Sequence, residues 1–563
     1  MSMDFDVIVV GSGVTGGWAA KELTEKGLKV LVLDRGRPLT HGSGYTTEHT
    51  PPWKIPFGGK PLRELYARDY AVQSKSYAFD ETTRHFWVKD SDYPYTQAQD
   101  APFHWLRADV VGGKSLLWAR QVYRWSDLDF EANRRDGHGV DWPIRYRDLE
   151  PWYAHVERFI GVSGQAEQLA QLPDSVFQPA MQMSVVEKAM KQRIEAQFPA
   201  RRMTIGRVAN LTEPLGDRAA CHYCGVCQRG CSPGAYFSSL SSTLPAASRT
   251  GNLTLRANSL VEGIDYDAAR GRVTGVRVID TETGARTRFG SRLVFLCGST
   301  IGSVQVLLNS RSESFPQGLA NRSGMLGRYV MDHVNGAIAF GITTEFMGRY
   351  YYGYRPNGIY IPRFRNLDAQ EPDGEFLRGY GFQGGAMALE APMIATAIPG
   401  FGAGFKQALR QPPAWAFFLA GFGECLPYAE NRITLDPKLV DRHGMPQVRF
   451  DVRFRDNEKK LLQDAAQQAR AMLEGAGLQN VLSVATPSTP GDAIHEMGGA
   501  CMGRDPQRSV LNGWNQSHDV PNLFVTDGSS MSSCGVVNPS LTFMALTARA
   551  ANHAVEQLRG GRV

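Results

Sequence analysis

The sequence predicts an α/β protein in which a doubly wound domain is discontinuous in the chain and carries a second domain inserted into it. Three observations predict this fold. First, an apolar run at residues 6–10 is followed by a glycine-rich turn and a helical stretch. Second, patterns typical of a strand followed by a helix occur again near 292–308 and 522–558. Third, the stretch 330–490 between them is rich in aromatic and turn residues. A short apolar run bounded by glycine is typical of a central parallel strand. We therefore expect one domain from 1–329 and 491–563, with 330–490 inserted as a separate sheet domain.

The N-terminal glycine turn has the spacing of a dinucleotide clamp. Gly11, Gly13 and Gly16 form a G-x-G-x-x-G turn between the first apolar strand and the first helix. The first glycine permits the tight turn, the second lets the backbone approach a pyrophosphate, and the third lets the helix pack on the strand. Phosphate groups then meet the unsatisfied amides at the helix N-terminus. Asp34 follows the second apolar strand, where a carboxylate binds ribose hydroxyls. The alternative is a glycine-rich turn without function.

Composition narrows the class of protein. The 563 residues are 42% hydrophobic and 21% charged, which is ordinary for globular domains and long enough for two or more of them. A net charge of +5, scattered without basic runs, argues against nucleic acid as a partner. The longest apolar stretch, 414–423, is about half of the roughly 20 residues that span a bilayer, so we expect no transmembrane segment. The N-terminus enters its first strand directly, which predicts no signal peptide in this chain.

Periodicity and turn residues predict further elements. The last helix is expected to begin at Asn538, a good N-cap, with Pro539 in its first position. The stretch 36–103 has too little periodicity to assign. The remaining expected elements are a helix at 146–162, strands at 253–256, 273–280, 292–296 and 522–526, a hairpin turn at 282–284, a helix after Ser299 and a helix at 457–473.

Four of the eight cysteines crowd into eleven residues. Cys221, Cys224, Cys227 and Cys231 have the spacing C-x2-C-x2-C-x3-C, which is typical of iron-sulfur ligation. Zinc sites usually separate two C-x2-C pairs by a longer gap, so zinc is the second reading and plain thiols the third. The run leaves open whether all four bind one 4Fe-4S cluster or three bind a 3Fe-4S cluster. The other four cysteines are isolated and predicted to be buried apolar residues.

Several stretches together resemble the glucose-methanol-choline (GMC) family of flavin oxidoreductases over nearly the whole chain. They are the glycine turn 11–16, the Gly112-Gly113 turn, residues 298–310, Asp527-Gly528, and the pair formed by 495–503 and 538–542. The resemblance implies an FAD-binding doubly wound domain beside a substrate domain built on an antiparallel sheet. It also implies substrate-side loops at about 40–105, a cysteine loop at 221–236, and a return to the FAD domain at 491–563 with the catalytic residues.

By this resemblance His495 is the catalytic base and Asn538 its partner at the reactive edge of the flavin. The chemistry agrees, because oxidation of an alcohol needs a base with a near-neutral pKa beside the hydroxyl while a hydride leaves the same carbon. Leu117 occupies the position of the histidine that attaches flavin covalently in pyranose oxidases, so we expect non-covalent FAD. The residues expected at the cofactor are Gly11, Gly13, Gly16, Asp34, Gly112, Gly113, Ser115, Trp118, Val261, Gly298, Asp527, Gly528 and Asn538.

The cysteine run, the stretch 141–153 and the residues 234–236 make the chain similar to the catalytic subunits of gluconate, fructose and glucose dehydrogenases and of glucoside 3-dehydrogenases. That likeness implies a small partner subunit, electron transfer through an iron-sulfur cluster to a cytochrome c or a quinone, and either periplasmic export with the partner or a cytoplasmic location. The expected reaction is oxidation of a hydroxyl of a sugar, glycoside or polyol, for example at C3 or C1 of a glucoside. Aromatic and amide groups suit sugars, so the candidate substrate residues, each of which could equally be core, are Tyr350, Tyr351, Tyr352, Tyr354 and Gln383.

Two rival functions stay open at this point. The first is a GMC oxidase that passes electrons directly to oxygen. The second, of another class, is a flavin and metal protein that only relays electrons or scaffolds a complex.

Overall fold

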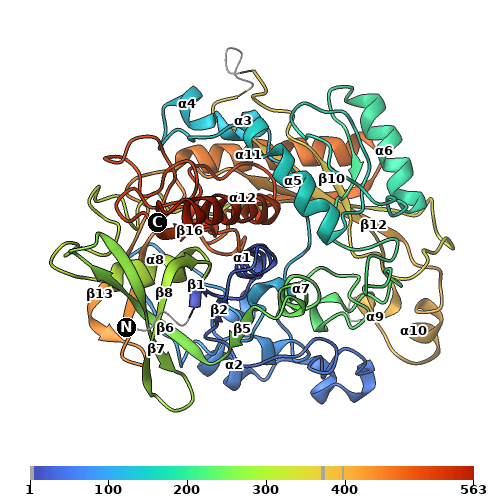
Figure 1. Ribbon diagram of the computed structural model, residues 1–563. Coiled ribbons are helices and arrows are strands. Elements are labelled where there is room, and N and C mark those ends of the chain that lie inside the picture. The colour runs from blue at the N-terminus through green and yellow to red at the C-terminus, as the bar shows by residue number, and fades with distance from the viewer. Residues whose placement is uncertain (1–4, 369–373, 396–397) are drawn as a thin grey trace.

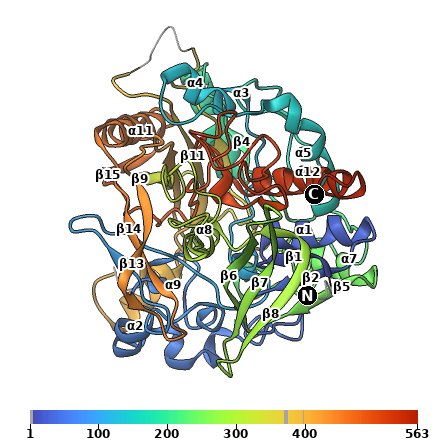
Figure 2. The same ribbon diagram turned by 60° about the vertical axis from the view of Figure 1, so that its left-hand side comes forward.

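The protein folds around three β-sheets, described here from a computed structural model that covers residues 5–368, 374–395 and 398–563 (Figure 1). The largest sheet has seven strands, the second has six and the third has three. In both views the C-terminal helix α12 (Ser540–Arg559) crosses the middle of the molecule, between the helix α11 (Asp456–Gly475) and the helix α1 (Val14–Glu25) (Figures 1 and 2).

The seven-stranded sheet is parallel in its core and antiparallel at one end. Its order is β5-β2-β1-β8-β7-β6, with β16 paired to β8 off this path. The pairs β5/β2, β2/β1, β1/β8 and β8/β16 are parallel, whereas β8/β7 and β7/β6 are antiparallel. The strands are β1 (Phe5–Val10), β2 (Val30–Leu33), β5 (Leu253–Arg256), β6 (Ser259–Asp267), β7 (Arg272–Asp280), β8 (Arg286–Leu296) and β16 (Leu523–Val525).

Both faces of the parallel sheet are buried along β2 and along residues 7–10 of β1, as an uninterrupted apolar strand requires, whereas the edge strand β5 is partly exposed. Alternate residues of β1 enter different cores: Val7 and Val9 pack with residues of α1, and Ile8 and Val10 pack in the largest apolar cluster of the protein. The helix α1 also packs against α12, and α12 against α5 (Tyr146–Ile160). The last helix of the chain is thereby fixed to the first.

The six-stranded sheet forms the second body of the protein. Its order is β15-β9-β12-β11-β10-β4, and every pair in it is antiparallel. The helix α11 lies across β9, β12 and β15 and contacts α6 (Val185–Gln197). The strands are β4 (Thr204–Ile205), β9 (Val334–Thr343), β10 (Ile359–Ile361), β11 (Tyr380–Ala388), β12 (Trp415–Gly423) and β15 (Gln479–Ala485).

Segments from before residue 330 contribute to this second body. The strand β4 extends its sheet and α6 covers α11, although both precede the predicted insertion. The small third sheet has the order β13-β14-β3, from β13 (Arg432–Val440), β14 (Pro446–Asp451) and β3 (Thr96–Gln97). Besides short 3-10 turns, the remaining α-helices of the described residues are α2 (Arg63–Asp69), α3 (Asp127–Phe130), α4 (Ala132–Asp136), α7 (Thr243–Arg249), α8 (Thr300–Asn309), α9 (Ala391–Ile394) and α10 (Gly402–Ala408).

The start of α12 corrects one expectation. Pro539, and not Asn538, occupies the N-cap, and the helix begins at Ser540. The amide of Asn538 is bonded to two other side chains instead of a helix N–H. Among the described residues, no helix is long and apolar enough to cross a bilayer.

Candidate active site

A single large cavity of about 1320 Å³ brings most of the predicted site residues together. Its lining comes from the carboxyl ends of β1 and β2, the turn after β8, the segment after β16 and the strands of the second sheet. This volume exceeds the roughly 300–1,000 Å³ of a pocket for one drug-sized ligand, so it has room for a dinucleotide and a substrate.

The N-terminal glycine turn forms one end of the cavity. Gly11 has a φ of +97°, and a Cβ there would lie 2.4 Å from the carbonyl oxygen of Cys297. A Cβ on Gly16 would lie 1.9 Å from the carbonyl oxygen of Gly11, so Gly16 sits behind the turn and allows α1 to approach it. Gly13 meets nothing within 4 Å and lines the cavity. The turn is therefore shaped to expose backbone, and the amides at the start of α1, to a ligand.

Asp34 lines the same end and also closes the turn. Its carboxylate accepts from the Ser12 amide at 2.8 Å, from the Ser12 hydroxyl at 2.5 Å and from the Gly36 amide at 2.7 Å. The Ser12 hydroxyl oxygen in turn accepts from the Gly112 amide at 2.8 Å. These bonds connect the two glycine turns, so the predicted ribose-binding carboxylate already has a fixed position.

The second glycine turn covers the cavity from another side. Gly113, Ser115 and Trp118 line it, whereas Gly112 lies behind them. Ser115 donates to the Gly112 carbonyl at 2.6 Å, and the indole of Trp118 donates to the Phe237 carbonyl at 3.0 Å. Leu117 also lines the cavity, and its alkyl side chain offers no atom for a covalent bond to flavin.

Asp527 and Gly528 complete the cradle. Asp527 is buried and accepts from the Ser303 hydroxyl at 2.5 Å and from Ser529, and burial raises its pKa. A Cβ on Gly528 would lie 2.4 Å from the Thr300 hydroxyl oxygen. Val261 and Gly298 line the cavity beside them. Of the predicted cofactor residues, all except Gly16 and Gly112 thus face one space, and those two support the turns behind it.

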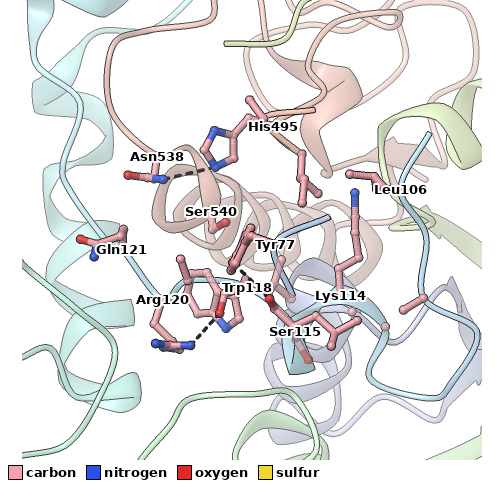
Figure 3. Close-up of a pocket in the computed structure, with 18 of the residues that line it drawn as sticks. Tyr77, Leu106, Lys114, Ser115, Trp118, Arg120, Gln121, His495, Asn538 and Ser540 are labelled. Carbon is pink, nitrogen blue, oxygen red and sulfur yellow. Dashed lines mark hydrogen bonds between the residues drawn. The ribbon is translucent and has the colours of Figure 1, made fainter. Parts of the chain in front are cut away.

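His495 and Asn538 meet at 3.2 Å between the His495 Nε2 and the Asn538 Nδ2, above the start of α12 (Figure 3). Gln383, on β11, donates its amide N–H to the Asn538 Oδ1 at 2.7 Å. This bond turns the amino group of Asn538 toward His495, so that the Nε2 of His495 is an acceptor. The Nδ1 of His495 lies 3.1 Å from the Nδ1 of His333. The proton of His495 therefore belongs on Nδ1, where His333 accepts it.

Burial keeps both imidazoles neutral. It lowers the pKa of His333 to about 4. It also lowers the pKa of His495 well below its usual value, and His333 and the Lys114 ammonium lower it further. A neutral imidazole that carries its proton on Nδ1 and its lone pair on Nε2 is the form that accepts a proton, once a substrate hydroxyl takes the place of the Asn538 N–H at Nε2.

Four residues at this end had not been predicted. The buried carboxylate of Asp332 accepts the backbone N–H groups of Gly491, Ala493 and His495 at 2.8, 3.2 and 3.0 Å. Lys114 pairs with the buried Glu496 at 2.9 Å, and both line the cavity. Lys114 directly follows the Gly112-Gly113 turn and Glu496 directly follows His495, so these two motifs could have indicated them. Asp332 and His333 belong to no recognisable sequence motif.

The predicted substrate residues form the outer part of the cavity. Tyr350, Tyr351, Tyr352 and Tyr354 all line it, and three of them are more than half exposed. Gln383 lines it too, although its amide N–H already serves Asn538. The tyrosines therefore face the opening and Gln383 lies beside the His495 pair.

The cysteine run lies on one loop near this opening. Cys224 is exposed, and Cys221, Cys227 and Cys231 are half-buried. Burial raises the pKa of Cys231 to about 11. Within the described part of the chain, no three His, Cys, Asp or Glu side chains are placed to hold a metal ion. The geometry thus gives the iron-sulfur expectation no support, and it stays a prediction from spacing. The isolated cysteines Cys297, Cys425, Cys501 and Cys534 are buried, as expected.

A glycine cradle on a parallel sheet, open to a cavity that ends at a neutral histidine, defines an oxidoreductase with a nucleotide cofactor. The GMC oxidoreductase description matches the chain at residues 5–335 for its N-terminal part and 427–547 for its C-terminal part. The chain belongs to the GMC oxidoreductase family, and it is an FAD-dependent oxidoreductase acting on CH–OH groups of sugar or alcohol substrates.

Relatives support this assignment over the full length. The chain is 29% identical to a 2-methyl-1,2-propanediol dehydrogenase of Mycolicibacterium austroafricanum, covering 97% of this chain and 94% of the relative. It is 26% identical to the fructose dehydrogenase large subunit of Gluconobacter japonicus, covering 100% and 99%. The crystal structure of a pyridoxine 4-oxidase from Mesorbium loti shares the fold, with a TM-score of 0.62 at 16% identity over 98% of this chain and 99% of that one.

Proposed function

We propose that the protein is a dehydrogenase that oxidises a hydroxyl of a sugar, glycoside or polyol, for example C3 or C1 of a glucoside, with His495 as the base. The observation that carries the proposal is the bonded series Gln383, Asn538, His495 and His333, which leaves the Nε2 of a neutral imidazole as the acceptor.

The residues of the cradle fit FAD. The amides at the start of α1 and the turn at Gly13 suit the pyrophosphate, Asp34 suits the ribose, and the N-terminus of α12 favours negative charge near the ring. When bound, FAD supplies the two-electron acceptor for the hydride. The substrate hydroxyl, placed between His495 and Asn538, donates its proton to the Nε2 and accepts a hydrogen bond from the Nδ2. His333 stabilises the resulting imidazolium by accepting from its Nδ1.

Two kinds of evidence support a sugar or polyol as substrate. The cavity opens between tyrosines, whose faces pack on the C–H groups of a sugar ring while their hydroxyls bond to its oxygens. Among the relatives, fructose dehydrogenase and gluconate 2-dehydrogenase of Pantoea cypripedii carry such substrates in their names, the second at 25% identity over 98% of this chain and 94% of the relative.

We extend the proposal to the electron acceptor on the cysteine spacing. The run would bind an iron-sulfur cluster that passes electrons to a cytochrome c or a quinone, with a small partner subunit. The name of the fructose dehydrogenase large subunit supports partner subunits. Iron and acid-labile sulfide at three or four atoms per chain, lost when Cys221 and Cys224 become serine, is the expected result. Zinc without sulfide would contradict it. No step of the chemistry above depends on the cluster.

An oxidase is the second candidate. A paromamine 6'-oxidase of Streptomyces fradiae is 26% identical over 97% of this chain and 90% of its own length, which is as similar as the dehydrogenases just named. Peroxide formation at a rate near that of dye reduction would favour the oxidase.

Anaerobic mixing with a panel of sugars tests the proposal. D-glucose, D-fructose, D-gluconate, methyl β-D-glucopyranoside and 2-methyl-1,2-propanediol are added separately to the purified FAD-loaded protein, and the flavin absorbance is followed. Bleaching by at least one sugar, absent in His495→Ala, is the expected result. A flavin that no sugar or polyol bleaches would refute the proposal and leave the electron-relay alternative.

A further inference from the structure

One tyrosine of the cysteine loop belongs to the wall of the substrate cavity. Tyr223 lies between Cys221 and Cys224 in sequence, yet it lines the same cavity as His495. Its backbone is in the left-handed region, at a φ of 61°, which an aromatic residue rarely adopts. Such a conformation persists only where its surroundings hold it, and it is found preferentially at functional sites.

The surroundings that hold Tyr223 are the substrate tyrosines. The backbone N–H of Tyr354 donates to the carbonyl of Tyr223 at 2.7 Å, and Cys224 pairs with Tyr354 in a parallel bridge. The rings of Tyr223 and Tyr352 meet edge to face, with centroids 6.3 Å apart and an angle of 68° between their planes. The cysteine loop and the tyrosine segment 350–354 are thus joined through both backbone and side chains.

The two segments also fit each other closely. A Cβ on Gly353 would lie 2.6 Å from the Cβ of Tyr223 and 2.8 Å from its carbonyl oxygen. A Cβ on Gly225 would lie 2.7 Å from the Cβ of Tyr354. The tyrosine segment therefore needs Gly353 where it contacts Tyr223, and the cysteine loop needs Gly225 where it contacts Tyr354. A shift of either segment would displace the other.

We propose that Tyr223 is a specificity-determining residue for the sugar, supplied by the cysteine loop, and that it couples the state of the four thiols to substrate affinity. The proposal rests on the proposed function in one respect, namely that this cavity takes a sugar. Two tyrosine rings at a steep angle form a corner that receives one face and one edge of a pyranose ring. Coupling between two sites is reciprocal. A change that loosens the cysteine loop should therefore weaken substrate binding, and a change that displaces the tyrosine segment 350–354 should make the thiols more accessible.

A pair of glycine variants in the tyrosine segment tests the coupling. Gly353→Ala places a methyl group against Tyr223, whereas Gly348→Ala, also at positive φ, meets nothing within 4 Å. Both changes strain the backbone alike, so the contact with Tyr223 is the difference between them. Tyr223→Ala, with its flavin content checked, removes the ring itself.

Two quantities are measured on the full-length FAD-loaded protein. One is the KM and kcat for the panel sugar that bleaches the flavin fastest, and the other is the rate at which iodoacetamide alkylates the half-buried Cys221, followed by peptide mass spectrometry. Gly353→Ala should raise the KM and speed alkylation, each about fivefold or more, which is the lower range of measured couplings. Its kcat should change little, and Gly348→Ala should leave both quantities near the wild-type values. Tyr223→Ala should raise the KM.

Equal effects of the two glycine variants, or a change in only one of the two quantities, would overturn the coupling. An unchanged KM in Tyr223→Ala would overturn the specificity role. If no panel compound bleaches the flavin, the proposed function fails instead, and the alkylation rates still decide whether the cysteine loop and the tyrosine segment are coupled.

Discussion

Removal of the Asp332 carboxylate should cost a large part of the stability of the protein. The carboxylate is fully buried and accepts three backbone N–H groups from the loop that ends at His495. Each buried N–H left without a partner costs about 1–3 kcal/mol, so Asp332→Ala should lower the free energy of unfolding by about 3–9 kcal/mol. That loss is comparable with the whole stability of about 5–15 kcal/mol of an ordinary domain.

Asp332→Asn is the matched control. The amide oxygen of asparagine, in the place of Oδ2, still accepts from the N–H groups of Gly491 and Ala493. The amide nitrogen, in the place of Oδ1, cannot accept from the N–H of His495, so that bond is lost. We expect Asp332→Asn to lower the free energy of unfolding by about 1–3 kcal/mol, because it leaves one buried N–H without a partner. Urea unfolding at pH 8, followed by circular dichroism and flavin fluorescence, measures both. Equal costs for Ala and Asn, or a cost of Asp332→Ala below about 1 kcal/mol, would refute the reasoning.

The pH dependence gives the same residue a second test. Burial raises the pKa of Asp332 from 3.8 to about 7, so the folded state holds this proton more tightly than the unfolded chain. The resulting stabilisation is fully present below pH 3.8 and is lost as the pH rises through 7. Its upper bound is about 4 kcal/mol at about 1.4 kcal/mol per pKa unit. Asparagine lacks this proton, so Asp332→Asn should cost more at pH 4.5 than at pH 8. A cost that is the same at both pH values would contradict the raised pKa.

Three further predictions concern the site. His495→Asn should lower the anaerobic rate of flavin reduction about 10²–10⁴-fold at an unchanged flavin content, because it removes a general base; a wild-type rate would exclude His495 as that base. Lys114→Met should move the acid limb of the kcat/KM profile to higher pH, because the ammonium lowers the pKa of His495 and the neutral imidazole is the active form; an unmoved or lower limb would contradict this. Gly11→Ala should lose FAD, because its Cβ would lie 2.4 Å from the Cys297 carbonyl oxygen, whereas Gly27→Ala, also at positive φ but in open space, should keep it; the flavin-to-protein ratio decides, and equal ratios would count against the cradle.

The sequence allowed much of the cofactor half of the fold to be predicted, since its strands are short apolar runs between glycines. The structure places β1, β2 and β5 and the helices α1 and α11 within a few residues of where the sequence predicts them. The strand β8 ends where predicted but begins earlier in the chain. The strand β6 was not predicted, because Gly263 and several charged residues interrupt its alternation of apolar and polar residues. The predicted start of α12 was wrong because the Asn538 amide bonds to Gln383 and His495, a tertiary demand that local capping rules do not contain.

The site was predictable where a motif carries its chemistry and not where folding alone creates it. The glycines, Asp34, His495 and Asn538 stand in recognisable spacings and line or support one cavity. Asp332 and His333 act through a loop more than 150 residues away in the chain, as their bonds to His495 show. No local window of the sequence contains both ends of that contact. The roles predicted for individual residues stay predictions until the variants are measured.

The pairing of β8 with both β1 and β16 has a consequence for biosynthesis. The strand β8 pairs with both β1 and β16, and β16 is synthesised about 500 residues after β1, before α12 packs on α1. Contacts so distant in sequence make assembly slow. Flavin can thus be enclosed only after β16 has been synthesised and has paired with β8, so a transport route that threads unfolded chains would have to deliver this protein empty and load it on the far side.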